Sequence, residues 1–300
     1  MNRASKPKRK QTWKNYAVWF ILPAFVFYTA FVIVPTFSSS YYSLTSWDGI
    51  SSEIRFIGLE NFREIWESSR VHNALYNTLF LAVVLVLLEN IVALGLAVLV
   101  DQVRWLCNLF RSIFYLPVLM SGVVMGFIWV ILLSYNFGVV NQLLDLLGLS
   151  HWKRDWLGDP DFAMLSIIVA TVWKSAGYYM VIYLAGLQGI SQELLEAASI
   201  DGAGRWQRFR HVTFPLLAGA MTVCIILSMI NALKIFDQIA VMTDGGPGFE
   251  TETLTYIIYK VAFGELRQGF GTALGIVLFL IILIISIIQI KVLRRREVEM

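Results

Sequence analysis

Residues 270–290 read FGTALGIVLFLIILIISIIQI, a run of 21 residues without a charge. An apolar stretch of about 18 or more residues with few charges is typical of a helix that crosses a membrane. The whole chain has the same character, because 57% of its 300 residues are hydrophobic and only 15% are charged, against roughly 25% charged residues in soluble domains. The mean hydropathy is +0.66. This composition excludes an ordinary water-soluble domain and predicts an all-α integral membrane protein.

A transmembrane helix needs about 20 mostly apolar residues. The segments that meet this requirement are 16–37, 73–100, 112–134, 162–187, 215–236 and 270–290. The first one follows a basic leader, so a cleaved signal peptide is an alternative interpretation. Its apolar part is longer than the roughly 7–15 residues of a signal-peptide core, and Pro23 and Pro35 interrupt it. Although the serines at 38–40 resemble a cleavage site, we expect the segment to be retained and the chain to have six spans.

Lysine and arginine are unevenly distributed around the six segments. If the N-terminus is cytoplasmic, the cytoplasmic segments hold fifteen Lys and Arg and the outer loops hold seven, as the positive-inside rule requires. We therefore expect both termini in the cytoplasm. Residues 1–15 form a basic cytoplasmic tail beside anionic lipid headgroups, residues 16–293 form one membrane domain, and residues 294–300 form a short cytoplasmic tail.

Two of the outer loops have a distinctive composition. The loop 135–161 contains NQLLDLLGLSHWKRDWLGDPD, an amphipathic helical turn that ends in coil rich in Trp and Gly. The loop 237–269 contains TDGGPGFETET, a cluster of turn formers that cannot lie inside a helix.

The cytoplasmic segment between the fourth and fifth spans, residues 188–217, is unusually polar for this chain. It includes EAASIDGAGRWQRFRHVTFPLL, residues 196–217. Ser191 is a candidate N-cap of a first short helix, and Gly202 and Gly204 can adopt the left-handed geometry that separates two helices. We expect Pro215 to end the second helix at the mouth of the fifth span.

Two interpretations of this helix–turn–helix segment follow from its shape alone. It is either a firm knob that fits a groove on another protein, or an interfacial loop whose Trp206 and Phe209 rest among lipid headgroups. A DNA-reading helix–turn–helix is less favoured, because membrane spans hold both of its ends.

The segment resembles the EAA loop of binding-protein-dependent ABC import permeases. The residues that fall on that loop are Glu196, Ala197, Ala198, Asp201, Gly202, Ala203, Trp206, Phe209 and Pro215. The stretches FIGLENF, TDGGPG and YIIYKVAF are similar to the maltose-type carbohydrate-uptake branch, in particular to its first permease. The resemblance extends from about residue 16 to residue 293.

This resemblance implies a mechanism and a set of partners. In that family the EAA loop forms coupling helices that dock on a cytoplasmic ATPase subunit, and Glu196 and Asp201 would face that partner or lock the turn. An acid that caps the second helix is an alternative role for Asp201. The implied complex contains a second permease subunit, two ATPase subunits and an extracytoplasmic solute-binding protein in a bacterial or archaeal cytoplasmic membrane. ATP and Mg would be bound by the ATPase, because this chain has no Gly-Lys pair and hence no Walker A loop.

Polar and aromatic residues inside the spans are the candidates for a substrate pathway. They are Glu89, Trp173, Lys174, Tyr178, Asn231, Phe236 and Asp237. A sugar requires both aromatic faces and hydrogen-bonding groups, although aromatic residues are more often packing or interface anchors. Glu89 and Lys174 are expected at similar depth, where a structural ion pair is favoured over direct contact with the solute. Lys234 and Asp237 lie at the outer end of the fifth segment, where snorkelling of the side chains toward the membrane surface adequately explains their presence.

The expected function is therefore that of a non-catalytic permease subunit for an oligosaccharide or related carbohydrate. Glycerol phosphate or another polyol-type solute is the alternative cargo, and a secondary transporter is a more distant alternative. An enzyme, a metal centre and nucleic-acid binding are not indicated, since the three histidines lie in three separate loops and the two cysteines in separate segments.

Overall fold

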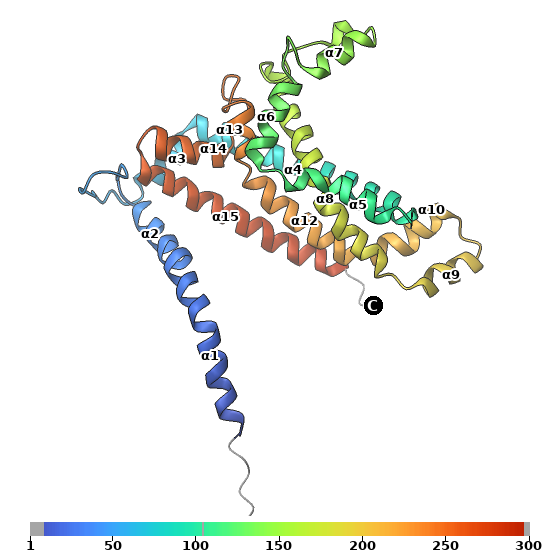
Figure 1. The fold of residues 1–300 in the computed structure, drawn as a ribbon. Helices are drawn as coiled ribbons and strands as arrows, with labels where there is room; N and C mark the ends of the chain where they lie inside the picture. The colour runs from blue at the N-terminus through green and yellow to red at the C-terminus, as the bar shows by residue number, and fades with distance from the viewer. Residues whose placement is uncertain (1–8, 104, 297–300) are drawn as a thin grey trace, which may run out of the picture.

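The computed structural model describes residues 9–103 and 105–296, and in this part of the chain the regular structure is helical (Figure 1). An isolated bridge between Thr45 and Phe56 is the only β-type pairing of these residues. In chain order the helices are α1 (Arg9–Tyr28), η1 (Thr29–Ile33), α2 (Val34–Tyr42), α3 (Glu60–Glu67), α4 (Ser69–Gln102), α5 (Cys107–Tyr115), η2 (Leu116–Leu119), α6 (Gly122–Leu132), α7 (Val139–Leu146), η3 (Ser150–Trp152), α8 (Pro160–Gln188), α9 (Gln192–Ile200), α10 (Arg205–Arg208), η4 (Phe209–Thr213), α11 (Phe214–Leu216), α12 (Ala218–Leu233), α13 (Asp237–Met242), α14 (Leu254–Tyr259), η5 (Lys260–Gly264), α15 (Gln268–Leu293) and η6 (Arg294–Arg296).

Four helical stretches in the described residues are long and apolar enough to cross a membrane. They are Trp19–Tyr42, α4, α8 and α15. Two further stretches are bent pairs: α5 with η2 meets α6 at 95°, and Arg205–Leu216 meets α12 at 67°. The third expected span, 112–134, is therefore broken rather than straight, whereas the second bend falls at the start of the fifth expected span, 215–236. The number of spans is six if each bent pair crosses as one.

The break in the third span has a local cause. Pro117 lies in the 3₁₀ turn η2, and proline disfavours continuation of a helix on its N-terminal side. Ser121 then caps the new helix α6 by accepting a hydrogen bond from the Val124 amide at 3.2 Å. Pro117 and Ser121 thus mark the end of one helix and the start of another.

The basic tail expected over residues 1–15 lies partly outside the described residues, which begin at Arg9. The helix α1 starts at that residue. At the other end α15 stops at Leu293, residues 294–296 form one 3₁₀ turn, and the remaining residues also lie outside the described part.

The packed core is formed by α4, α8 and α12, with α15 beside α12 (Figure 1). Small buried residues on α4, such as Ala93 and Ala97, let the helices approach closely around Tyr179 and Tyr183 of α8. By contrast, α1 and α2 project away from the bundle (Figure 1), and none of the residues from Trp19 to Tyr42 is buried. The bundle therefore has a packed centre and an N-terminal helix whose apolar surface is uncovered.

Candidate functional site

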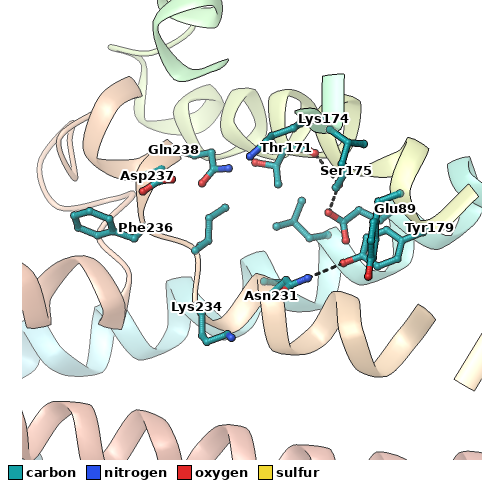
Figure 2. A pocket seen from close by; sticks show the side chains of 15 residues that line it. Glu89, Thr171, Lys174, Ser175, Tyr179, Asn231, Lys234, Phe236, Asp237 and Gln238 are labelled. Atoms are coloured by element: carbon teal, nitrogen blue, oxygen red, sulfur yellow. Dashed lines mark hydrogen bonds between the residues drawn. The ribbon is translucent and has the colours of Figure 1, made fainter. Parts of the chain in front are cut away.

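A cavity of about 440 Å³ lies between α4, α8, α12 and the start of α13 (Figure 2). Its walls combine carboxylates, lysines, amides, hydroxyls and aromatic rings. The lining residues are Leu85, Glu89, Val118, Thr171, Lys174, Ser175, Tyr178, Tyr179, Asn231, Ala232, Lys234, Ile235, Phe236, Asp237 and Gln238. Of the seven predicted pathway residues, all except Trp173 line this cavity.

Helical periodicity explains how α8 supplies a third of this lining. Thr171, Lys174, Ser175, Tyr178 and Tyr179 are spaced by three or four residues, which places them on one face of a helix. Trp173 lies on a different face, where its ring packs edge-on against Trp129 with centroids 5.9 Å apart. The structure therefore places Trp173 outside the cavity.

Glu89 is 4% exposed, and its partner differs from the one expected. The Ser175 hydroxyl lies within hydrogen-bonding distance of the Glu89 carboxylate and also of the Thr171 carbonyl oxygen. Among the ion pairs of the described residues, none includes Glu89 or Lys174. The expected Glu89–Lys174 ion pair is therefore wrong. Both side chains line one cavity, but the group that binds the Glu89 carboxylate is the hydroxyl of Ser175, the residue after Lys174 in α8.

The opposite wall of the cavity is formed by α12 and α13. The Asn231 amide donates to the Tyr179 hydroxyl at 3.2 Å, and Tyr179 packs edge-on against Tyr178 with centroids 5.2 Å apart. Phe236 presents a ring that also contacts Tyr259 at a centroid distance of 5.0 Å. Figure 2 shows Asn231 and Tyr179 pointing toward each other across the end of the cavity.

The charges around the cavity balance. Two carboxylates, Glu89 and Asp237, and two lysines, Lys174 and Lys234, are among the lining residues. Asp237 lies against the first residue of α6, because a Cβ at Gly122 would be 2.3 Å from the Asp237 Oδ2. The lining has equal numbers of formal positive and negative charges, which suits an uncharged polar solute better than an ion.

Several lining residues were not predicted from the sequence. Thr171, Ser175 and Gln238 are ordinary polar residues, although the spacing of Thr171 and Ser175 relative to Lys174 is a detectable signal. Gln238 follows a break at the end of α12, and no periodicity in the sequence places it beside α8.

A second layer of polar contacts lies one helical turn from the cavity, on the side of the 188–217 segment. The Tyr183 hydroxyl donates to Asn90 Oδ1 at 2.6 Å, and the Asn90 amide donates to Ser228 Oγ at 3.0 Å. These two bonds join α8, α4 and α12, so the helices that line the cavity are also tied together below it.

The 188–217 segment contains the two short helices expected from its sequence. Ser191 caps α9 by accepting from the Glu193 amide at 3.2 Å. Gly202 has a φ of +80°, in the left-handed region that favours glycine. Gly204 does not, because its φ is −65°, so only one glycine makes the turn.

One alternative role considered for Asp201 requires correction. Asp201 is the C-cap of α9, and the residue at the N-cap of α10 is Gly204, whose amide donates to the Gln207 side chain at 2.8 Å. Asp201 therefore does not cap the second helix. Pro215 lies at the end of that helix as expected, because the helical stretch ends one residue later, at Leu216, and bends by 67° into α12. The π-helical turn η4, in which the Phe214 amide bonds the Phe209 carbonyl, precedes the proline, and such a turn accommodates a residue without an amide hydrogen.

The tip of this segment is firmly shaped and exposes two large apolar side chains. The Arg208 guanidinium donates to Ser199 Oγ at 2.8 Å and so ties the second helix to the first. Trp206 stacks on Phe209 with centroids 5.8 Å apart, yet Trp206 remains 68% exposed and Ile200 87% exposed. Glu196, Ala197 and Gly202 are exposed as well. An exposed apolar tip on a stiff support is typical of a protein-docking element.

Comparison with known proteins agrees with this architecture. A family model described as the inner membrane component of binding-protein-dependent transport systems matches residues 89–298. Helices of membrane-spanning length around a polar cavity define the chain as a transport permease. It belongs to the family of inner membrane components of binding-protein-dependent transport systems, which confirms the resemblance found in the 188–217 segment.

Relatives with similar sequences match over nearly their whole length. The probable starch degradation products permease of Thermoanaerobacterium thermosulfurigenes is 37% identical, over 98% of this chain and 99% of the relative. The trehalose/maltose permease of Thermococcus litoralis is 32% identical, over 99% of both chains. The sulfoquinovosyl glycerol permease of Agrobacterium fabrum is 31% identical, over 94% of this chain and 91% of the relative.

Two solved structures share the fold. A chain of a bacterial ABC transporter that imports the acidic polysaccharide alginate matches with a TM-score of 0.83 and 26% identity, over 95% of this chain and 96% of that chain. A second match, with a TM-score of 0.84, comes from the alginate transporter in complex with an alginate pentasaccharide-bound periplasmic protein.

Proposed function

We propose that this permease is one of two transmembrane subunits of an ATP-driven importer and forms half of a pathway for a carbohydrate. The single observation that carries the proposal is the cavity between α4, α8, α12 and α13. Asn231, Gln238 and Ser175 offer hydrogen bonds for sugar hydroxyls, and Tyr178 and Phe236 offer aromatic faces. These are the groups that recognise a polyhydroxylated ring.

An uncharged oligosaccharide is favoured over glycerol phosphate as the cargo. The two carboxylates of the lining are matched by two lysines, so the cavity carries no excess positive charge for a phosphate dianion. The names of the similar proteins, which refer to starch products, trehalose, maltose and the acidic polysaccharide alginate, support a carbohydrate as the class of solute.

We further propose that the chain crosses the membrane six times with both termini in the cytoplasm, and that the 188–217 segment docks on a separate ATPase subunit. The helix α8 runs from the cavity directly into this segment, and α12 returns from it. The Tyr183–Asn90–Ser228 bonds hold both helices against α4. A displacement of the apolar tip would therefore reach the cavity through stiff, connected helices.

The proposed partners follow from the surfaces that the chain leaves uncovered. Asn231, Lys234 and Tyr178 are exposed at the open side of the cavity, so a second permease subunit is needed to close the pathway. A solute-binding protein would deliver the carbohydrate from outside, as the periplasmic protein accompanies the alginate transporter. ATP and Mg belong to the ATPase in this proposal, and the permease itself performs no chemical step.

Transport by the assembled complex tests the proposal. The permease is reconstituted in proteoliposomes with its companion permease, its ATPase and its loaded binding protein, and uptake of labelled oligosaccharide is measured with and without ATP. We expect ATP-dependent uptake of the oligosaccharide, reduced at least about tenfold by Asn231→Ala because a hydrogen-bonding group is lost from the pathway. Trp173→Phe, outside the cavity, serves as the control and should leave uptake unchanged. Uptake driven by an ion gradient without ATP would overturn the proposal in favour of a secondary transporter.

A further inference from the structure

A second cavity, away from the proposed pathway, lies on the outer flank of α8. It has a volume of about 340 Å³ and is lined almost entirely by apolar side chains of α6, α7, α8 and the coil that precedes α8. Trp129, Val140, Trp156, Phe162, Leu165 and Val169 form most of its wall. We call this cavity the flank groove. Ser166 is its polar exception, and its hydroxyl is already bonded to the Trp156 carbonyl at 3.0 Å.

The groove is held open by a built framework. Asn141 is 2% exposed and accepts a hydrogen bond from the Trp156 indole at 2.9 Å. The same Asn141 donates to the carbonyl oxygens of Tyr135 and Arg154. Trp156 in turn packs edge-on against Phe162, with centroids 5.9 Å apart. The coil between α7 and α8 is thus fixed as one wall of the groove.

A cation without a carboxylate partner among the described residues packs on two of the aromatic rings that line the groove. The Arg154 guanidinium lies over Phe162, 4.0 Å from the ring centroid, and 5.7 Å from that of Trp156. Its one side-chain hydrogen bond among the described residues joins Nε to the Trp152 carbonyl at 3.4 Å, and no ion pair of those residues includes it. The neighbouring Lys153 differs, because it bonds Asp145 at 2.7 Å. Both Nη groups of Arg154 therefore remain available to an external anion.

The helix next to the groove has an uncovered apolar face. Leu143, Leu146 and Leu147 at the end of α7 are 51%, 82% and 71% exposed. Figure 1 shows α6 leading away from the bundle to α7, beyond the ends of the central helices. A short amphipathic helix with aromatic and basic residues beside it is typical of an element that lies in the headgroup region of a bilayer.

We propose that the flank groove binds an anionic phospholipid of the outer leaflet, with an acyl chain along α8 and the phosphate on Arg154. The proposal rests on the orientation given above, in which the 135–161 loop is outside. An apolar body with a single cationic end matches the chemistry of such a lipid, and arginine forms charge-assisted bidentate bonds to phosphate. A protein partner would also require polar groups along the rim, and the groove wall offers one hydroxyl that is already bonded.

Lipid retention by the purified transporter complex tests this site. The complex is extracted in mild detergent and equilibrated with equal amounts of phosphatidylglycerol and phosphatidylcholine, and the bound lipids are counted by native mass spectrometry. We expect the unaltered complex to retain phosphatidylglycerol preferentially, and Arg154→Gln to lower that preference about tenfold. Arg154→Lys should keep most of the preference, because the charge remains. Val169→Trp, which fills the groove from an exposed position, should lower retention of both lipids.

The matched control is Arg55→Gln, which removes an outer-loop arginine that does not line the groove. It should behave as the unaltered complex. Equal retention of phosphatidylglycerol by Arg154→Gln and the unaltered complex would overturn the proposal, as would a Val169→Trp complex that keeps its bound lipid. Because the readout is bound lipid and not uptake, a failure here leaves the proposed transport function untouched.

Discussion

Gly177 of α8 lies directly against the carbonyl oxygen of Phe114, so closely that a Cβ at position 177 would be 2.0 Å from that oxygen. The backbone of α8 thus touches the backbone of α5 shortly before the bend of the third expected span, which falls between Leu119 and Gly122. Since Val118, four residues after Phe114, is part of the cavity wall, the contact between two main chains helps to set the width of the cavity.

Gly177→Ala is therefore expected to destabilise the protein. The new methyl group meets backbone atoms that cannot rotate away, and overpacking of this kind costs about 1–3 kcal/mol. Gly95→Ala is the control, because a Cβ at Gly95 in α4 meets no atom within 4 Å. Thermal unfolding in detergent should show a lower midpoint for Gly177→Ala and an unchanged or raised one for Gly95→Ala. Equal midpoints would contradict the close contact.

Glu252, in the loop after α13, forms a buried ion pair with Arg70 of α4 that should contribute far more to stability than an exposed counterpart. Glu252 is 1% exposed and accepts two hydrogen bonds from Arg70 at 2.7 and 2.8 Å. Removing one partner of a buried pair costs about 3–5 kcal/mol, so Glu252→Gln should strongly lower the unfolding midpoint. The matched pair is Arg267 with Glu64, also doubly bonded but with both side chains nearly half exposed.

Glu64→Gln is accordingly expected to cost only about 0–1 kcal/mol. The two variants make the same chemical change to a carboxylate that binds an arginine in two places. The pairs differ in burial, and Arg70 keeps a second, more exposed carboxylate partner, Glu265, at 3.1 Å. If both variants lowered the unfolding midpoint equally, the buried ion pair of Glu252 would contribute no more to stability than the exposed pair of Glu64.

The features of the fold that depend on composition and local periodicity could be predicted from the sequence. Long apolar runs located the helices of membrane-spanning length, and the spacing of Ser191 and Gly202 located the first short helix and its turn. The break at Ser121 was missed because the run 112–134 is apolar on both sides of Pro117, so hydropathy alone cannot reveal a 95° bend.

Side-chain partners were predicted less well, because they depend on the rotation of one helix relative to another. Glu89 and Lys174 were expected at similar depth and do line the same cavity. Depth alone could not show that Ser175, the next residue of α8, is the one that faces the carboxylate. Trp173 was misplaced for the same reason, since a shift of one residue rotates a helical side chain by about 100°.

The bond between Glu89 and Ser175 predicts how charge reversal should behave. Glu89→Lys and Lys174→Glu should each reduce uptake, because each places an altered charge in the cavity wall. Combining them should not restore uptake, since the two side chains form no ion pair. Ser175→Ala should reduce uptake as Glu89→Gln does, because it removes the hydroxyl that holds the carboxylate. Uptake by the double-reversal variant equal to that of the unaltered protein would show that Glu89 and Lys174 pair during transport.

Gly202 offers a test of the proposed coupling role of the 188–217 segment. Its φ of +80° costs an L-residue about 1–2 kcal/mol, less for asparagine and more for a β-branched residue. Gly202→Val should therefore displace the exposed Trp206 tip, leave membrane insertion intact, and abolish uptake together with stimulation of the ATPase by loaded binding protein. Gly202→Asn should retain much of both activities.

Gly204→Ala is the matched control, because Gly204 has an ordinary φ of −65° and the nearest atom to a Cβ there is the Gln207 Oε1 at 3.7 Å. It changes the same turn without strain and should transport normally. Co-purification of the ATPase with each variant separates docking from later steps, since only Gly202→Val should lose the ATPase subunit. A Gly202→Val permease that keeps the ATPase bound and still transports would show that the shape of this turn does not carry the coupling.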